Sequence, residues 1–275
     1  MNAPTSNGPT FDSLDGLDET AVTGLRHIVL ACADTKLLLG YHYGEWTFGP
    51  PELEAAVANC SLSQTELGHV RLLHAVLKRH YDDDPDALID DRAGRDFANV
   101  AFLDGDLPDW PAYVAANYIV DLAITRVLHS MRGSAFKPLR MSLDKMIDEE
   151  RYHAHHGTGW FRTVAQRGDR ERALLAERCQ EALESVVTWF GPPDEPGDAA
   201  IVKAGIKARA NGDIRAAMLE DVSAMAGSLG VELTAGVPKT WAGWNPATRR
   251  AKGDGPADDI LYHLRGASNA IFKLA

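Results

Sequence analysis

The chain has 275 residues, of which 45% are hydrophobic, so it is long enough to bury a sizeable core. Its formal net charge of −11 argues against nucleic acid or an anionic membrane as the main partner. Residues 1–16 lack the basic and apolar stretches of a signal peptide, and no apolar run is long enough to span a membrane. Three widely spaced cysteines, Cys32, Cys60 and Cys179, indicate neither a disulfide framework nor a cysteine zinc site. We therefore expect a cytoplasmic protein.

Taken in chain order, the sequence predicts helices separated by short turns and no strands. A polar, flexible arm is expected over residues 1–18. Glycine and proline mark the ends of the helices that follow, and Asp169 is expected to cap the start of one of them. Helices are predicted over 19–48, 52–81, 109–132, 134–167, 169–190 and 256–272, with two or three shorter ones after the linker at 191–197. The fold class predicted by this pattern is all-α.

Each of the first four long helices carries an apolar stripe that is interrupted near its middle by polar residues. A charge buried in such a stripe is costly unless it is paired or bound to metal. Four interruptions at similar depth therefore predict one shared site. The interrupting residues are Lys36 in the first helix, Glu66 and His69 in the second, Asp121 in the third, and Glu150 and His153 in the fourth.

The positions of these residues agree with a helical hairpin. Lys36 and Glu66 lie equally far in sequence from Pro51, so they are expected to face each other across antiparallel helices. Asp34 is near Lys36 in sequence but lies on another side of the helix, so it is a poor substitute as a ligand.

Glutamate and histidine three residues apart share one face of a helix, and this spacing occurs in both Glu66/His69 and Glu150/His153. Carboxylate-bridged di-iron sites in helix bundles use this pair twice, together with one carboxylate from each of two other helices. The sequence therefore predicts a ferritin-like four-helix bundle with additional C-terminal helices. The alternative is a buried polar network without metal. The expected divisions are an arm at 1–18, a metal-site bundle at 19–190 and a helical extension at 191–275 packed on the bundle.

At these motifs the sequence resembles the phenylacetyl-CoA epoxidase family, whose paralogous catalytic and structural subunits are both ferritin-like. The resemblance runs from about residue 25 to 168, with a weaker similarity at the C-terminal helix. Segments 44–46, 51–54 and 149–153 are similar to the structural subunit, which lacks the glutamates of the two Glu-x-x-His pairs. Segments 64–69 and 149–153 are similar to the catalytic subunit, and Asp121 matches the carboxylate in its third bundle helix. The resemblance implies a metal-ligand set of Glu66, His69, Asp121, Glu150 and His153.

The sixth ligand of the catalytic subunit, a glutamate in the first helix, is replaced here by Lys36. Three carboxylates, one divalent ion and a protonated Lys36 sum to zero charge, whereas two divalent ions would leave a positive core. We therefore hypothesise one tightly bound metal and a second that is weak or absent. Lys36 would be an ion-pair partner of Asp121 or Glu66, or a neutral amine if two metals bind. Both Lys36 and Asp121 are candidate catalytic residues.

Two functions follow from the resemblance. The first is an iron-dependent, O₂-using monooxygenase or epoxidase that acts on an aromatic or related CoA thioester, with an external electron donor. The second is a non-catalytic structural subunit in which Lys36 replaces metal. A metal store is the least favoured alternative. Manganese in place of iron stays open, as does a mononuclear or a di-iron site. A paralogous subunit and a reductase are the expected partners, in a homodimer or heteromer joined through the first two helices.

Three other features have open interpretations. The basic segment 249–252 could contact CoA phosphates or form a solvated loop. Tyr43 could line a channel or pack in the core. His156 could support His153, whereas His155 is expected to point elsewhere.

Overall fold

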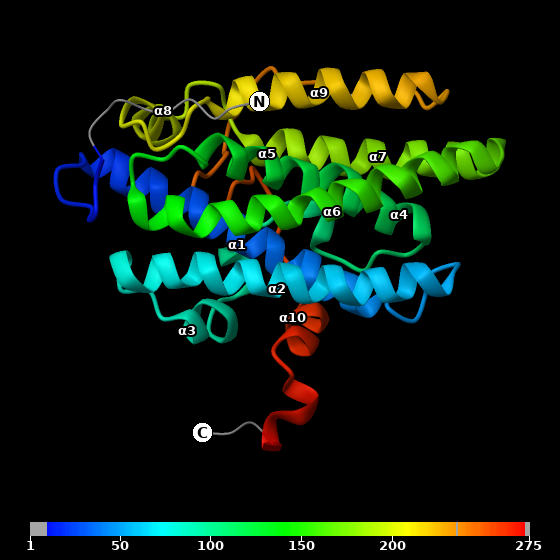
Figure 1. Cartoon of the computed structure of the whole chain (residues 1–275), viewed down its shortest axis with the longest axis horizontal. Helices are drawn as coiled ribbons and strands as arrows, with labels where there is room; N and C mark the ends of the chain where they lie inside the picture. Colours follow the sequence, from blue (N-terminus) through cyan, green and yellow to red (C-terminus); the bar gives the residue numbers. More distant parts are fainter. Residues whose placement is uncertain (1–9, 235, 273–275) are drawn as a thin grey trace.

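The computed structural model describes residues 10–234 and 236–272 (Figure 1). Within these ranges the regular elements are helices, and the only β-type pairings are isolated bridges. The predicted all-α fold is therefore confirmed. The elements in chain order are α1 (Glu19–Glu45), α2 (Leu53–Tyr81), α3 (Pro85–Asp90), η1 (Gly94–Asp96), η2 (Ala101–Leu103), α4 (Trp110–Ala115), η3 (Ala116–Asp121), α5 (Leu122–Met131), α6 (Lys137–Arg167), α7 (Asp169–Phe190), α8 (Pro196–Lys203), α9 (Asn211–Ser228), α10 (Asp258–Leu264) and η4 (Ala267–Phe272).

Four helical segments form the bundle that holds the candidate site. Helices α1 and α2 make an antiparallel hairpin, and α6 packs against α2. The fourth segment runs continuously through α4, η3 and α5 and packs against α6, while α7 covers its outer side (Figure 1). Apolar residues from all of these helices form one continuous core, as expected for a ferritin-like bundle.

The third bundle helix contains a feature that the apolar pattern does not predict. Residues Ala116–Asp121 form a π-helical segment between α4 and α5. A π-segment widens the helix locally and shifts the residues after it around the axis, and such segments are frequent at functional sites. Here the segment ends at Asp121, which is one of the predicted ligands.

Several predicted helix limits differ from those observed. The first helix ends at Glu45, and the next turn is tighter, because the backbone N–H of Thr47 bonds the carbonyl of Gly44 three residues back instead of four. The fourth bundle helix begins at Lys137, since the chain before it follows an extended path. The expectation that Asp169 is an N-cap was wrong: it is the first helical residue, and its side chain makes no capping hydrogen bond.

The segment after α7 packs back onto the bundle before leaving it. Helix α8 crosses α1 so closely that a Cβ added at Gly24 would lie 2.6 Å from the carbonyl oxygen of Gly197. Helix α9 packs on α5 and α7. The last predicted helix is instead two pieces, α10 and η4, separated at Gly266, and Figure 1 shows them projecting beyond α2.

The basic segment at 249–252 is divided: its two arginines are buried, whereas Lys252 is exposed, as expected for a solvated loop. Arg249 and Arg250 are buried, 3% and 6% exposed respectively. Arg249 donates to the carbonyls of Trp189 and Phe190 at the C-terminal end of α7, and Arg250 pairs with Asp104 at 2.6 Å. Unsatisfied carbonyls at a helix end attract cations, so Arg249 serves as a cap rather than a ligand for phosphate.

None of the helices among the described residues is long and apolar enough to cross a membrane. The predicted divisions at 1–18, 19–190 and 191–275 stay a prediction, and residues 1–9 of the expected arm lie outside the described residues. Within the described part of that arm, the backbone of Phe11 exchanges hydrogen bonds with Ala135 and Lys137.

Candidate metal centre

Six polar side chains from the four bundle segments meet in the middle of the core. The structure brings together every residue predicted for the site, and each is at most 2% exposed. Their helical stripes place them there because each sits at a core-facing position of an otherwise apolar face. The six residues are Lys36 from α1, Glu66 and His69 from α2, Asp121 from η3, and Glu150 and His153 from α6.

The ammonium of Lys36 lies between the carboxylates of the site. Its Nζ donates to Glu66 Oε2 at 2.7 Å and to Glu150 Oε1 at 2.6 Å. Asp121 Oδ1 lies 3.6 Å from the same nitrogen. The expected pairing of Lys36 with Asp121 or Glu66 is therefore part of a wider network, in which one ammonium faces three carboxylates.

Each histidine approaches the carboxylates through Nδ1, and the two rings define two halves of the site. His69 Nδ1 lies 3.2 Å from Glu150 Oε1 and 3.6 Å from Glu66 Oε2, the two oxygens that also accept from Lys36. His153 Nδ1 lies 2.8 Å from Asp121 Oδ2 and 3.3 Å from Glu66 Oε1. Glu66 therefore spans both halves. Lys36 shares the half of His69, and Asp121 belongs to the half of His153.

Burial and charge act in opposite directions on the groups of this site. Burial raises the pKa of Glu66 and Glu150, but the Lys36 ammonium and the contacts with His69 and His153 together outweigh it. The pKa of Glu150 falls to about 2, and that of Glu66 lies well below its usual range. Asp121 is farther from Lys36, so burial and the charges of Glu150 and Glu66 raise its pKa to about 7. The carboxylates in turn overcome the burial of Lys36 and raise its pKa well above its usual range, which keeps it charged.

Four further residues, which their spacing in the sequence does not assign to the site, support the predicted ligands through hydrogen bonds. Tyr43 donates to Asp121 Oδ2 at 3.1 Å, and Asn117 Nδ2 donates to the Tyr43 hydroxyl at 3.0 Å. Thr125 donates to Glu150 Oε2 at 2.5 Å, while Glu149 Oε2 is 2.9 Å from His69 Nε2. Such outer partners orient metal-binding groups.

A sequence signal for these residues exists but is weak. Asn117 and Thr125 lie four residues before and after Asp121, on the same helical face. Tyr43 lies on the stripe of Lys36, two turns nearer the hairpin, and it was considered from the sequence only for a channel or for packing. A polar residue within such a stripe is equally compatible with ordinary packing, so spacing alone does not assign it to the site.

The donor atoms present fit one metal ion. Ligand atoms of Glu66, Asp121, Glu150 and His153 all lie within 4.8 Å of one another. Glu66 Oε1 and Asp121 Oδ1 are buried with no hydrogen-bond partner, so the half containing His153 presents unshared oxygens. Carboxylate oxygens and imidazole nitrogens are common ligands of divalent iron, manganese and zinc. The Lys36 ammonium lies in the other half, 2.7 Å from Glu66 Oε2 and 2.6 Å from Glu150 Oε1.

A small cavity approaches the centre from the side of η3. Its volume is about 30 Å³, and its lining includes Asn117, Asp121 and Thr125. A cavity of this size holds one water molecule or a similarly small species. It is too small for an aromatic acyl group.

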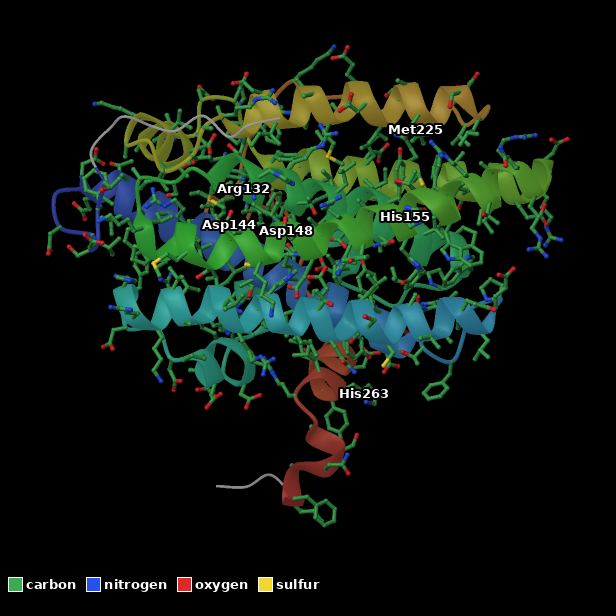
Figure 2. All side chains as sticks on the ribbon, viewed as in Figure 1. Arg132, Asp144, Asp148, His155, Met225 and His263 are labelled. Atoms are coloured by element: carbon green, nitrogen blue, oxygen red, sulfur yellow. The ribbon has the colours of Figure 1, made fainter. Side chains whose placement is uncertain are left out.

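Two groups of residues near the motifs lie outside the centre. Asp34 is buried, but Arg92 binds both of its carboxylate oxygens, at 2.5 and 2.9 Å, which supports its exclusion as a ligand. His155 is exposed on α6 (Figure 2), as expected. His156 makes no hydrogen bond through its buried Nε2 and packs near Tyr113, so it gives His153 no direct support.

Together, the bundle and its buried carboxylate–histidine cluster define a ferritin-like protein with a candidate metal centre. The sequence model of one family, described as phenylacetic acid catabolic protein, matches residues 11–252. The chain therefore belongs to this family, and the predicted resemblance is confirmed. A search of curated proteins gives no match to the chain.

Proposed function

We propose that this chain is a ferritin-like oxygenase subunit whose buried centre binds one divalent metal ion instead of two. Membership of the phenylacetic acid catabolic family implies an oxygenase subunit of the di-iron type. One observation carries the departure from that type: the Lys36 ammonium lies within hydrogen-bonding distance of Glu66 and Glu150, in the half of the site that faces His69.

The proposed ligands are Glu66, Asp121, Glu150 and His153. With Lys36 protonated, these three carboxylates and one divalent ion give a neutral buried site, which a low-dielectric core favours. His69 keeps its Nε2 bonded to Glu149 and directs Nδ1 at the oxygens bonded to Lys36, so it acts as a support and not as a ligand. Iron is the proposed metal, and manganese would suit the same donors.

Iron bound here would supply O₂ activation with electrons from an external donor. The role of the chain is to hold the ion in a dry core, to orient the ligands through Tyr43, Asn117 and Thr125, and to keep Lys36 as a fixed positive charge beside Glu66 and Glu150. By family membership, the proposed substrate is an aromatic or related CoA thioester and the proposed partners are a paralogous subunit and a reductase.

A second candidate is a structural subunit whose centre holds no metal. Two observations favour it. Lys36, together with protonated His69 and His153, would neutralise the three carboxylates without any ion, and the pKa of each of these histidines is raised by the carboxylates despite burial. The cavity beside the centre, about 30 Å³, also excludes an aromatic acyl group from the site in this conformation.

Assays with the purified chain separate the two candidates. The chain is supplied with iron, a chemical or enzymatic reductant, O₂ and phenylacetyl-CoA, and the CoA thioesters are analysed by mass. A product that gains one oxygen atom, and that disappears in Glu150→Ala, supports the oxygenase. A metal-free chain that forms no product alone but raises the activity of a paralogous subunit supports the structural role.

A further inference from the structure

A row of aromatic side chains connects the candidate centre with the surface. Tyr43 contacts the centre directly, because its hydroxyl donates to Asp121 Oδ2 at 3.1 Å. The ring centroid of Tyr43 lies 5.4 Å from that of Tyr113. Tyr113 in turn stacks on Trp110, with 4.4 Å between centroids and 6° between ring planes. The row therefore passes from a proposed metal ligand through two buried phenols to an indole on α4.

The outer end of the row is a cluster of three tryptophans. Trp110 lies 5.7 Å from Trp46 and 5.0 Å from Trp160, measured between ring centroids. All three are partly exposed, whereas Tyr43 and Tyr113 are buried. The cluster comes from the residue that follows α1, the start of α4 and the C-terminal part of α6. One end of the row thus reaches the surface while the other reaches Asp121.

Packing alone does not require the hydroxyl groups of the two tyrosines in this row. Phenylalanine would fill a core position as well as tyrosine, yet both tyrosines place buried hydroxyls on specific acceptors. Tyr113 donates to the amide oxygen of Asn59 at 2.7 Å, and Tyr43 donates to a carboxylate. Tyrosine and tryptophan are also among the side chains most easily oxidised by one electron. The centroid separations of 5.4 and 4.4 Å are those of neighbouring rings close to contact. Electrons pass readily between redox-active groups at such short range.

We propose that Trp110, Tyr113 and Tyr43 form a path for single electrons between the surface and the buried centre. This deepens the proposed function, on which it rests for its biological role: it gives an external donor a route into a core that no redox protein can enter. The surface near Trp46, Trp110 and Trp160 is then where the donor delivers its electrons.

The contacts of Tyr43 and Trp110 provide a route for both the electron and the proton. A strong one-electron oxidant at the centre, which the proposed function would generate from O₂, would take one electron from Tyr43. The phenolic proton would shift along the existing hydrogen bond to Asp121 Oδ2 and leave a neutral phenoxyl radical. An electron from Trp110 then reduces this radical across the stacked ring of Tyr113, and Asp121 returns the proton. The indole radical cation left at Trp110 is reduced by a flavin or iron–sulfur protein. In total, one electron moves from the donor to the centre and no proton is gained or lost.

Photochemical oxidation of the full chain tests the path without requiring turnover. A ruthenium tris-bipyridine complex with persulfate generates a one-electron oxidant in solution on illumination, and radicals are trapped by freezing and identified by electron paramagnetic resonance. The oxidant removes an electron from Trp110, and an electron from Tyr43 then reduces the Trp110 radical. We expect a long-lived tyrosyl radical in the native chain, because Tyr43 is buried and its proton stays on Asp121. Exposed tyrosyl radicals decay faster.

Three variants make the result specific. Tyr43→Phe should lose the long-lived tyrosyl signal and leave a tryptophan radical in its place, and Trp110→Phe should lower the yield of the tyrosyl signal. The matched control is Tyr118→Phe, since Tyr118 is also buried, at 8% exposed, but stacks on Phe161 outside the row. It should behave as the native chain.

An unchanged tyrosyl signal in Tyr43→Phe, or an equal loss in Tyr118→Phe, would overturn the proposal. If Tyr43→Phe does not fold, Trp110→Phe decides alone, and a full tyrosyl yield from it would be contradictory. Metal content is measured on the same samples. A chain without metal but with the Tyr43 radical would refute the metal site and leave the path intact, so the two failures are distinguishable.

Discussion

Lys36 Nζ lies 2.7 Å from Glu66 Oε2, and the other oxygen of the same carboxylate has no hydrogen-bond partner. One side chain thus has two roles: it accepts a hydrogen bond from a fixed ammonium on one side and presents a free oxygen towards His153 on the other. This division of Glu66 underlies the proposal that one half of a two-metal site is filled by lysine and the other remains available to an ion.

Replacing the ammonium by a carboxylate should open the second half of the site. In Lys36→Glu, four carboxylates would balance two divalent ions, as in the di-iron template. We expect the metal content to double relative to the native chain, measured by elemental analysis after growth with iron and manganese available. Without metal, this variant should be less stable than the native chain, because the buried carboxylates lose their partner, at a cost of about 3–5 kcal/mol. Added ferrous iron should restore its melting temperature. Equal metal content in both proteins would contradict this expectation.

The two histidines should differ in their effect on metal binding. His153 approaches the half of the site with unshared oxygens, whereas His69 approaches the oxygens that Lys36 already holds. We expect His153→Ala to lose the metal and His69→Ala to retain most of it, as measured by equilibrium dialysis against ferrous or manganous ion. The two substitutions remove the same side chain from adjacent bundle helices, so each is a control for the other. Equal loss from both would indicate that His69 is also a ligand.

Two glycines of α6 provide a matched pair for the packing beside Asp121. A Cβ added at Gly157 would lie 2.7 Å from Asn117 Oδ1, but a Cβ at Gly159 meets no atom within 4 Å. Gly159→Ala should stabilise the chain by roughly 0.5–1 kcal/mol, because alanine is the better helix former. Gly157→Ala should destabilise it and weaken metal binding, since Asn117 must move away from Tyr43 and Asp121. Denaturant unfolding and metal titration of both variants check this. Stabilisation by Gly157→Ala, with unchanged metal affinity, would show that Asn117 moves at no cost.

The buried arginine at the end of α7 should matter for stability and not for substrate. Arg249 donates to the carbonyls of Trp189 and Phe190. Arg249→Met should leave these carbonyls without a charged partner and lower the free energy of unfolding by about 1–3 kcal/mol. Lys252, in the same basic segment, is exposed, and Lys252→Met should change stability little. Thermal unfolding is the measurement. Loss of CoA thioester affinity in Arg249→Met without a change in melting temperature would instead support a phosphate contact.

Much of the bundle was predictable because its signals are local. The apolar stripes and the glycine and proline stops predict the long helices, and equal sequence distances from Pro51 predict that Lys36 meets Glu66, which the structure shows at 2.7 Å. The partners of buried charges were harder to predict, because they come from distant segments. Arg92 reaches Asp34 and Arg250 reaches Asp104 only through tertiary packing. The π-segment that ends at Asp121 also leaves no mark in the apolar pattern.

The same distinction applies inside the site. The paired Glu-x-x-His spacing identifies groups that share a face, but it does not show where an ammonium from another helix lies between them. The contacts show that Lys36 and His69 approach the same oxygens of Glu66 and Glu150. This places Lys36 and His69 in one half of the site and leaves the other half to His153.

The most direct test of the central claim is the number of metal ions per chain in the native protein. Elemental analysis is made on protein purified from cells grown with iron and manganese both available, together with the Glu150→Ala and His153→Ala variants. We predict one divalent ion per native chain and none in either variant. Two tightly bound ions per native chain would contradict the assignment of Lys36 to the second half of the site. No ion at all, with unchanged stability on adding iron, would contradict the metal centre and favour the structural subunit.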